Sequence, residues 1–328
     1  MVIAPHLVLK NYYVKYVFNK NCTKCDNERD AGLTTPEDIE RFDNLNYGNG
    51  SKWNLLDVYR PKNVSGKLPV IVSVHGGGYM YGTKETYQFY CMNLAQRGYA
   101  VVNFNYHLGP KHIFPVPVKE TNMVMKWIVK NSEKYGLDTQ NVMMVGDSAG
   151  AQICSQYAAC VTDASYAKIM ELEIPQFHLI ALGLNCGIYD IESKRANGTD
   201  NLMDLYFTKN PEKVFGDKMK LKEHITKDFP PSYLISSPGD FLLTNLKPME
   251  DLLKERGVET KSKVYGDENT FHVFHVNIKS DLAKEANDYT CGPLSVQGEN
   301  IYATGFVAPE DDLENVEVEK STVVVSLG

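Results

Sequence analysis

Residues 141 to 150, Asn-Val-Met-Met-Val-Gly-Asp-Ser-Ala-Gly, decide the fold. Their first half is an apolar run of the buried-strand type, and a helical pattern follows from about residue 149 to 162. The turn between them spells G-x-S-x-G from Gly146 to Gly150. Glycines on both sides of Ser148 allow a sharp turn that would raise its hydroxyl above the sheet. By itself, the pentapeptide is also compatible with an ordinary glycine-rich turn between a strand and a helix.

The alternation of strands and helices continues on both sides of this turn. β-rich runs predict strands at 53–60, 68–74, 99–105, 141–145, 177–184, 232–237 and 259–265. Helical patterns cover 86–97, 117–134, 149–162, 246–256 and about 275–288. This order predicts an α/β fold in which βαβ units build a mostly parallel central sheet with helices on both faces. We expect a single domain over residues 1–328.

Two segments interrupt this alternation, namely the first 40 residues and residues 188–229. Both are rich in aromatic residues: Tyr12, Tyr13, Tyr16, Tyr206, Phe207 and Phe215. We expect the two segments to pack together above Ser148 as a small helical cap, with apolar side chains that line a substrate pocket. The alternative is that they decorate the surface away from the site.

The tail from about residue 291 to 328 is a third irregular segment. Its residues 322–326, Thr-Val-Val-Val-Ser, have strong β propensity and little charge. Left in water, such a run would aggregate, so its apolar face has to be covered. We expect 322–326 to pair with another strand, either in a hairpin with residues 300–306 or on a neighbouring subunit. The second option would make the protein a homodimer.

The composition is that of an ordinary globular protein, with 328 residues of which 43% are hydrophobic and 23% are charged. A net charge of −7 argues against nucleic acid as a partner, because an acidic surface repels phosphate backbones. No run approaches the roughly 20 apolar residues that a membrane span requires. The stretch from Met1 to Phe18 lacks the pattern of a signal peptide.

Seven cysteines are scattered along the chain, and this odd number argues against a disulfide framework. A reducing, cytoplasmic setting fits best. Cys22 and Cys25 have the C-x-x-C spacing of redox and zinc sites, but no second pair lies nearby. We therefore expect two free thiols near the surface and no metal site.

A second glycine-rich stretch, His-Gly-Gly-Gly-Tyr at 75–79, directly follows a predicted strand. Successive glycines let backbone N–H groups converge on one point, which is what an oxyanion hole requires. We expect the donors to be the N–H groups of Gly77, Gly78 and Ala149, the last being the residue after the serine. A flexible loop would also explain the glycines. A phosphate-binding loop is disfavoured because no G-K-[ST] follows.

Asp240 and His272 each follow a later predicted strand. A serine hydroxyl is a poor nucleophile until a base removes its proton, and the base needs a carboxylate that fixes its tautomer. The chain order Ser148, Asp240, His272 is the one expected for this arrangement of strands. Taken alone, Asp240 would be a turn residue. His275, expected in the first turn of the last helix, is a rival base, but a loop after a strand end reaches the serine more easily.

Together these stretches resemble the hormone-sensitive-lipase-like branch of the α/β-hydrolases, over about residues 50 to 288. The matching stretches are His75 to Tyr79, Tyr106 to Pro110 with Phe114-Pro115, Gly146 to Gly150, Pro230-Pro231 before a strand that ends at Asp240, and His272 to Phe274. The resemblance implies the α/β-hydrolase fold with a cap, carboxylesterase activity on short or medium acyl esters, and no cofactor. It maps the nucleophile onto Ser148, the acid onto Asp240 and the base onto His272. Within the matching stretches, Tyr79 and Asp147 are the predicted substrate contacts.

The chain departs from the family pattern at three positions. Members often have H-G-F where this chain has His-Val-Phe at 272–274, and often an acid where Thr244 stands. An Asp is common where Glu120 sits. None of these differences removes a catalytic function, so they indicate a divergent subgroup.

Three functions remain open at this point. The first is a carboxylesterase whose partner is a small-molecule ester. The second is an amidase, deacetylase or peptidase that uses the same machinery on a C–N bond. The third is a non-catalytic ligand-binding protein of the same fold, and the apparent completeness of the set Ser148, Asp240 and His272 argues against it.

Overall fold

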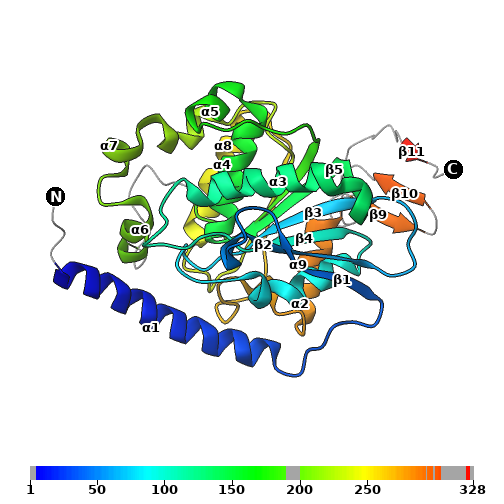
Figure 1. The fold of residues 1–328 in the computed structure, drawn as a ribbon, viewed down its shortest axis with the longest axis horizontal. Helices are drawn as coiled ribbons and strands as arrows, with labels where there is room; N and C mark the ends of the chain where they lie inside the picture. Colours follow the sequence, from blue (N-terminus) through cyan, green and yellow to red (C-terminus); the bar gives the residue numbers. More distant parts are fainter. Residues whose placement is uncertain (1–4, 190–199, 293, 298–299, 304–322, 326–328) are drawn as a thin grey trace.

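An eight-stranded sheet with helices on both faces forms the centre of the protein (Figure 1). The computed structural model describes residues 5–189, 200–292, 294–297, 300–303 and 323–325. The strand order is β1-β2-β4-β3-β5-β6-β7-β8, in which the pairs β1–β2 and β2–β4 are antiparallel and the remaining pairs are parallel. The strands are β1 (Ile39–Asn46), β2 (Leu55–Pro61), β3 (Leu68–Val74), β4 (Ala100–Phe104), β5 (Leu137–Asp147), β6 (Leu179–Asn185), β7 (Ser232–Ser236) and β8 (Thr260–Val264). This sheet confirms the predicted fold class.

Helices cover both faces of the sheet, and each face has its own core. The helices are α1 (Pro5–Asp30), α2 (Lys84–Ala95), α3 (Val116–Tyr135), α4 (Ala149–Thr162), α5 (Ala164–Ile169), α6 (Asp200–Phe207), α7 (Pro211–Phe215), α8 (Leu246–Glu255) and α9 (Asp281–Cys291). Successive residues of a strand point to opposite faces, so Val70 and Val72 of β3 belong to the core that also contains residues of α3, α4 and α8. Ile71 between them belongs to the other core, with α2 and α9.

The parallel strands bring the predicted site segments to one edge of the sheet. The glycine-rich stretch at 75–79 follows β3, and Ser148 follows β5. Asp240 and His272 come after β7 and β8 in the same way. Ligands of open α/β sheets bind outside the carboxyl ends of the strands, so this edge is the place to look for a site.

The sequence analysis gave no bounds for α1, which it expected only as part of a helical cap, and it missed the strand β1. Figure 1 shows α1 as a long helix on the outside of the domain. The sequence of α1 shows no clear apolar stripe, because the side of the helix that lines the cavity described below carries Asn21, Cys22 and Asp26 as well as Phe18. β1 is an edge strand with a register shift between Phe42 and Leu45 and little burial, so its alternation is weak.

The last helix was also predicted wrongly at its start. α9 begins at Asp281, whereas residues 274–276 form a separate 3₁₀ turn, η5 (Phe274–Val276). His275 and Val276 are buried in this turn, which gave the segment the apolar spacing of a helix. His275 therefore lies in η5 and not in the first turn of the last helix.

The tail forms a small antiparallel sheet of β9 (Leu294–Gln297), β10 (Asn300–Ala303) and β11 (Val323–Val325). β11 pairs with β10 of the same chain: Val325 lies opposite Ile301, and Val323 lies opposite Ala303. The hairpin form of the tail prediction is therefore confirmed.

No helix in the part of the chain that the structure describes is long and apolar enough to cross a membrane.

A buried ion pair fixes the start of α2 to the sheet. Lys84 Nζ lies 2.9 Å from Asp57 Oδ1, and both side chains are almost fully buried. Tyr59 donates a hydrogen bond of 2.8 Å to the same carboxylate, and the Lys84 N–H donates to Asn105 Oδ1 at 2.6 Å. This network connects β2 to α2, the helix that carries Tyr87 into the site described below.

Replacing Lys84 by Met should lower the free energy of unfolding by about 3–5 kcal/mol, because Asp57 would stay buried without its cation. Urea denaturation measures this loss. Lys67→Met is the matched control: it breaks the exposed Lys67–Glu133 pair and should cost less than about 1 kcal/mol. Equal, small losses in the two variants would contradict the anchoring role of the buried pair.

Candidate active site

Ser148 occupies the tight turn between β5 and α4, with the positive φ of 52° that few non-glycine residues adopt. Its N–H donates a hydrogen bond of 3.0 Å to the Asn185 carbonyl at the end of β6. A Cβ atom on Gly146 would lie 2.5 Å from the Gly150 carbonyl oxygen, and one on Gly150 would collide with the Val74 carbonyl. Both glycines are thus required by close packing. The serine side chain faces a cavity of about 370 Å³.

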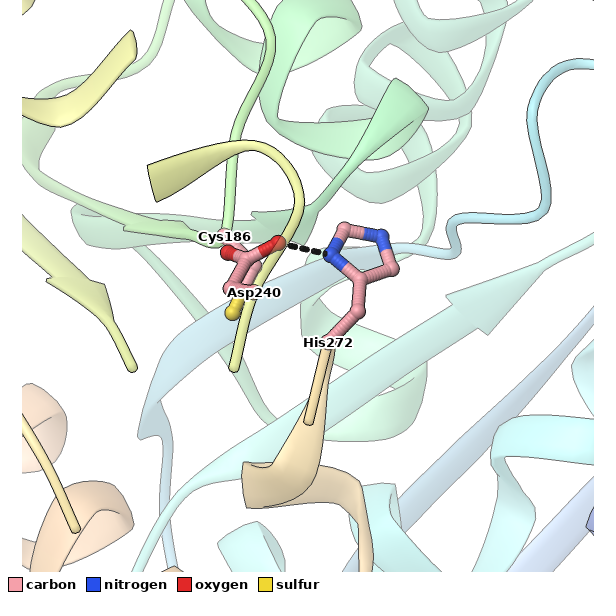
Figure 2. Close-up of side chains that lie close together, drawn as sticks. All are labelled: Cys186, Asp240 and His272. Atoms are coloured by element: carbon pink, nitrogen blue, oxygen red, sulfur yellow. Dashed lines mark hydrogen bonds and ion pairs between the residues drawn. The ribbon is translucent and has the colours of Figure 1, made fainter. Parts of the chain in front are cut away.

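His272 and Asp240 meet beside this cavity (Figure 2). His272 Nδ1 lies 2.6 Å from Asp240 Oδ1, and His272 and Ser148 both line the cavity. With the proton on Nδ1 shared with the carboxylate, Nε2 of His272 is left as a base. Residues from three separate loops are thereby brought together at one edge of the sheet.

Asp240 is held as an ionised carboxylate by three donors. Besides His272, the Leu242 N–H donates to Oδ1 at 2.9 Å and the Ser236 hydroxyl donates to Oδ2 at 2.7 Å. Burial by itself would raise the pKa of Asp240, but these hydrogen bonds outweigh burial and hold the pKa below its usual range. The carboxylate is consequently charged and oriented at neutral pH.

The rival base, His275, lies in a different environment. Its side chain is fully buried, and neither ring nitrogen has a hydrogen-bond partner among the described residues. Burial lowers the pKa of His275 to about 3, so it is neutral at physiological pH. His275 is not part of the cavity lining, whereas His272 is.

The 75–79 loop presents its backbone to the same cavity. Gly77 and Gly78 have φ values of 107° and 56°, in the region that favours glycine. Both residues and Ala149 line the cavity, and within the described ranges no group accepts a hydrogen bond from their N–H groups. At the base of the loop, the His75 ring stacks on the Tyr106 ring with 4.1 Å between the ring centres. Burial lowers the pKa of His75 to about 4, so this histidine is neutral at physiological pH.

Strained backbone is concentrated around this cavity. Three non-glycine residues with positive φ line it: Tyr79, Ser148 and Val273, with φ of 62°, 52° and 55°. A fourth, Cys186 with φ of 47°, lies next to Asp240 and His272. Such conformations cost roughly 1–3 kcal/mol each and persist where the surrounding structure enforces them, which is typical of functional sites. Val273 also explains the usual glycine of the H-G-F pattern, since this position requires a left-handed backbone.

Cys186 lies close to Asp240 and His272 (Figure 2). The candidate ligand atoms of Cys186, Asp240 and His272 lie within 4.8 Å of one another, the distance condition for a metal site. Burial raises the pKa of the Cys186 thiol well above 9, so the thiolate that a metal needs is costly to form. A metal would also separate His272 from Asp240, so we regard this donor set as unsuited to one. Nothing in the sequence distinguished Cys186 from the other cysteines.

The cavity contains side chains from both segments that the sequence analysis expected above Ser148. α1 contributes Phe18, Asn21, Cys22, Cys25, Asp26 and Arg29, and the later segment contributes Ile188 and Met203. The tyrosines that drew attention to the first segment, Tyr12, Tyr13 and Tyr16, are instead exposed. Residues 190–199 of the later segment lie outside the described residues.

The two predicted substrate contacts, Tyr79 and Asp147, both line the cavity. The Tyr79 ring stacks on Tyr206 at 3.8 Å. Asp147 Oδ2 accepts a hydrogen bond of 2.7 Å from the Tyr87 hydroxyl. The sequence analysis did not single out Tyr87, because it lies within a helical pattern that carries no motif.

Cys22 and Cys25 lie one turn apart in α1, as part of the cavity wall, and both are free thiols. Cys25 is exposed and Cys22 is half-buried. Burial raises the pKa of Cys22 to about 11, which disfavours the reactive thiolate of a redox site. No third metal-ligating side chain joins them among the residues that the structure describes.

The comparisons with known proteins point to one family. The family model BD-FAE matches residues 56–244, more than half of the chain. The versiconal hemiacetal acetate esterase of Dothistroma septosporum is 28% identical over 225 residues, which are 63% of this chain and 67% of that protein. The acetyl esterase of Salmonella choleraesuis is 26% identical over 244 residues, 70% of this chain and 72% of its own length.

Solved structures share the fold. Esterase B from Lactobacillus rhamnosis, in a structure with a tributyrin phosphonate, superposes with a TM-score of 0.78 at 20% identity. That superposition covers 87% of this chain and 93% of the other. A hyperthermophilic esterase from Pyrobaculum calidifontis has a TM-score of 0.67 at 22% identity and covers 89% of this chain and 98% of its own.

The unusual environment of Asp147 predicts a pH-dependent stability. Burial raises the pKa of Asp147 to about 6, against the opposing effect of the Tyr87 hydrogen bond. An unfolded Asp titrates near pH 4, so the folded protein binds the extra proton between about pH 4 and 6 and loses stability as the pH rises through this range. Asp147→Asn removes that loss. Its free energy of unfolding relative to wild type should therefore increase by about 2–3 kcal/mol from pH 4 to pH 7.

Chemical denaturation at several pH values measures this difference. Asp228→Asn, at an exposed carboxylate, is the control and should show no such trend. A difference between Asp147→Asn and wild type that stays constant with pH would mean that Asp147 titrates normally.

Proposed function

We propose that Ser148, Asp240 and His272 form the catalytic triad of this protein. The chain belongs to the BD-FAE family of α/β-hydrolases. The protein is a carboxylesterase-type hydrolase, and both relatives described above are named as esterases. The observation that carries the triad proposal is the contact of 2.6 Å between His272 and Asp240 beside the cavity that Ser148 faces.

The proposed reaction follows from this arrangement. Ser148 Oγ attacks the ester carbonyl carbon while His272 Nε2 takes the hydroxyl proton. The resulting tetrahedral oxyanion accepts hydrogen bonds from the N–H groups of Gly77, Gly78 and Ala149, and His272 then gives its proton to the departing alcohol. Water, activated by the same histidine, hydrolyses the acyl-enzyme and regenerates the serine. Asp240 stabilises the imidazolium in both steps.

The proposed substrates are esters with short to medium acyl chains. A cavity of about 370 Å³ lies at the lower end of the sizes known for small-molecule sites. Its wall is largely apolar, with Phe18, Ile188, Met203 and Phe241 among the lining residues. Such a wall stabilises a short hydrocarbon chain and leaves little room for a long one. Tyr79 and Asp147 are proposed to shape the cavity next to the reacting carbonyl.

The proposal includes a cap of residues 1–40 and 188–229 over the single α/β-hydrolase domain. The lining side chains from α1, together with Met203 from α6, support it. A cytoplasmic location is proposed from the seven cysteines, none of which forms a disulfide in the structure. A homodimer stays a prediction, but β11 no longer argues for it, because β11 pairs with β10 of its own chain.

Hydrolysis of p-nitrophenyl esters tests the acyl-chain proposal. We expect kcat/KM to be highest for acetate to hexanoate and to fall for laurate and longer chains, because the cavity has no room for them. Ser148→Ala should reduce kcat by about 10⁴-fold or more. An enzyme that prefers long chains, or a Ser148→Ala variant with full activity, would contradict the proposal.

The choice of base is tested by comparing two histidine variants. His272→Ala should reduce kcat by a factor similar to that of Ser148→Ala, because the histidine and the serine act together in one step. His275→Ala should keep kcat within a few-fold, although the cavity it leaves lowers the melting temperature. Full loss of turnover in His275→Ala with activity retained in His272→Ala would reverse the assignment.

A further inference from the structure

A single buried hydroxyl connects the two segments that supply the proposed oxyanion hole. Tyr87, in the first turn of α2, donates a hydrogen bond of 2.7 Å to Asp147 Oδ2 and accepts one of 3.2 Å from the Gly76 N–H. Gly76 directly precedes the donors Gly77 and Gly78. Asp147 directly precedes Ser148, whose neighbour Ala149 provides the third donor. The bridge thus links the loop after β3 to the turn after β5.

The two segments lie too close together for an ordinary side chain between them. A Cβ atom on Gly76 would collide with Asp147 Oδ2 and would lie 2.9 Å from the Asp147 carbonyl oxygen and 3.2 Å from the Tyr87 hydroxyl. Gly76 is therefore held against Asp147 both by direct packing and by its hydrogen bond to the Tyr87 hydroxyl. The rest of α2 is held in place by the Lys84–Asp57 ion pair, so Tyr87 projects from a fixed helix.

The geometry gives Tyr87 no proton to donate to a substrate. A tyrosine hydroxyl has one hydrogen, and here that hydrogen is committed to Asp147. Burial raises the pKa of Tyr87 well above 10, so the hydroxyl stays neutral and is unsuited to act as a general base. Although Tyr87 lines the cavity, its polar atom is directed at the protein.

We propose that Tyr87 is a positioning residue that sets the spacing between the two halves of the oxyanion hole through the Gly76–Tyr87–Asp147 bridge. This inference rests on the proposed function. An oxyanion hole works only when its donors converge on one oxygen, and displacements of about 0.5–1 Å are enough to reduce the rate severely. Because the bridge affects the transition state more than the bound ester, its loss should appear in kcat and not in KM.

The chain contains a matched control one turn further along the same helix. Tyr90 is as buried as Tyr87, but its hydroxyl has no hydrogen-bond partner in the described part of the chain. Tyr87→Phe and Tyr90→Phe remove the same atom from neighbouring buried rings. The bridge is the difference between them.

Steady-state kinetics with p-nitrophenyl butyrate, together with inhibition by an alkyl trifluoromethyl ketone, test the proposal. Such a ketone forms a tetrahedral adduct whose oxyanion resembles the transition state. Tyr87→Phe should lower kcat by about tenfold or more and leave KM within twofold of wild type. It should raise the inhibition constant of the trifluoromethyl ketone by the same factor as it lowers kcat. Tyr90→Phe should stay within about twofold of wild type in both measurements.

The outcomes separate this inference from the proposed function. A wild-type protein without ester turnover would refute the function itself. An active wild type in which Tyr87→Phe matches Tyr90→Phe, or raises KM at unchanged kcat, would refute the positioning role alone. Should Tyr87→Phe fail to fold, Asp147→Ala breaks the same bridge and has to lower kcat by a similar factor; full activity in that variant would overturn the proposal.

Discussion

The backbone of Ser148, held at a φ of 52° where β5 turns into α4, is the constraint on which the rest of the structure depends. Its conformation costs roughly 1–3 kcal/mol and is stable only because the surroundings enforce it. β5 supplies that support, since it is paired with β3 on one side and β6 on the other. The Ser148 N–H bond to Asn185 fastens the turn to β6 as well. Pairing and packing thus hold the strained serine at the cavity where we propose that it attacks the ester.

The other parts of the site are supported in comparable ways, each by a buried polar contact. Asp240 is fixed by donors from Ser236 and Leu242, and it in turn orients His272. The loop proposed to supply the oxyanion hole is fixed through the His75 ring, which stacks on Tyr106, and through the Tyr87 hydroxyl. On such a scaffold the proposed catalytic groups would need little rearrangement during the reaction, and preorganisation of this kind is usually the largest source of transition-state stabilisation in enzymes.

An element or a site residue could be predicted from the sequence where neighbouring residues determine its structure. The turn at 146–150 and the strand 68–74 have local causes, glycine spacing and a continuous apolar run, and both were predicted with their bounds. Asp240 and His272 were predictable because a parallel sheet brings successive strand ends to one edge. Tyr87, Cys186 and α1 were not, since their roles arise from contacts between distant segments. A tyrosine inside a helical pattern looks the same in sequence whether or not its hydroxyl bridges two loops.

The central claim is that Ser148 is the nucleophile, and covalent labelling tests it most directly. The protein is treated with a fluorophosphonate, digested and analysed by peptide mass spectrometry. The account predicts a single adduct, on Ser148, that is absent in the Ser148→Ala variant and greatly slowed in His272→Ala. An adduct on another residue of the wild-type protein, or undiminished labelling of Ser148→Ala, would contradict it.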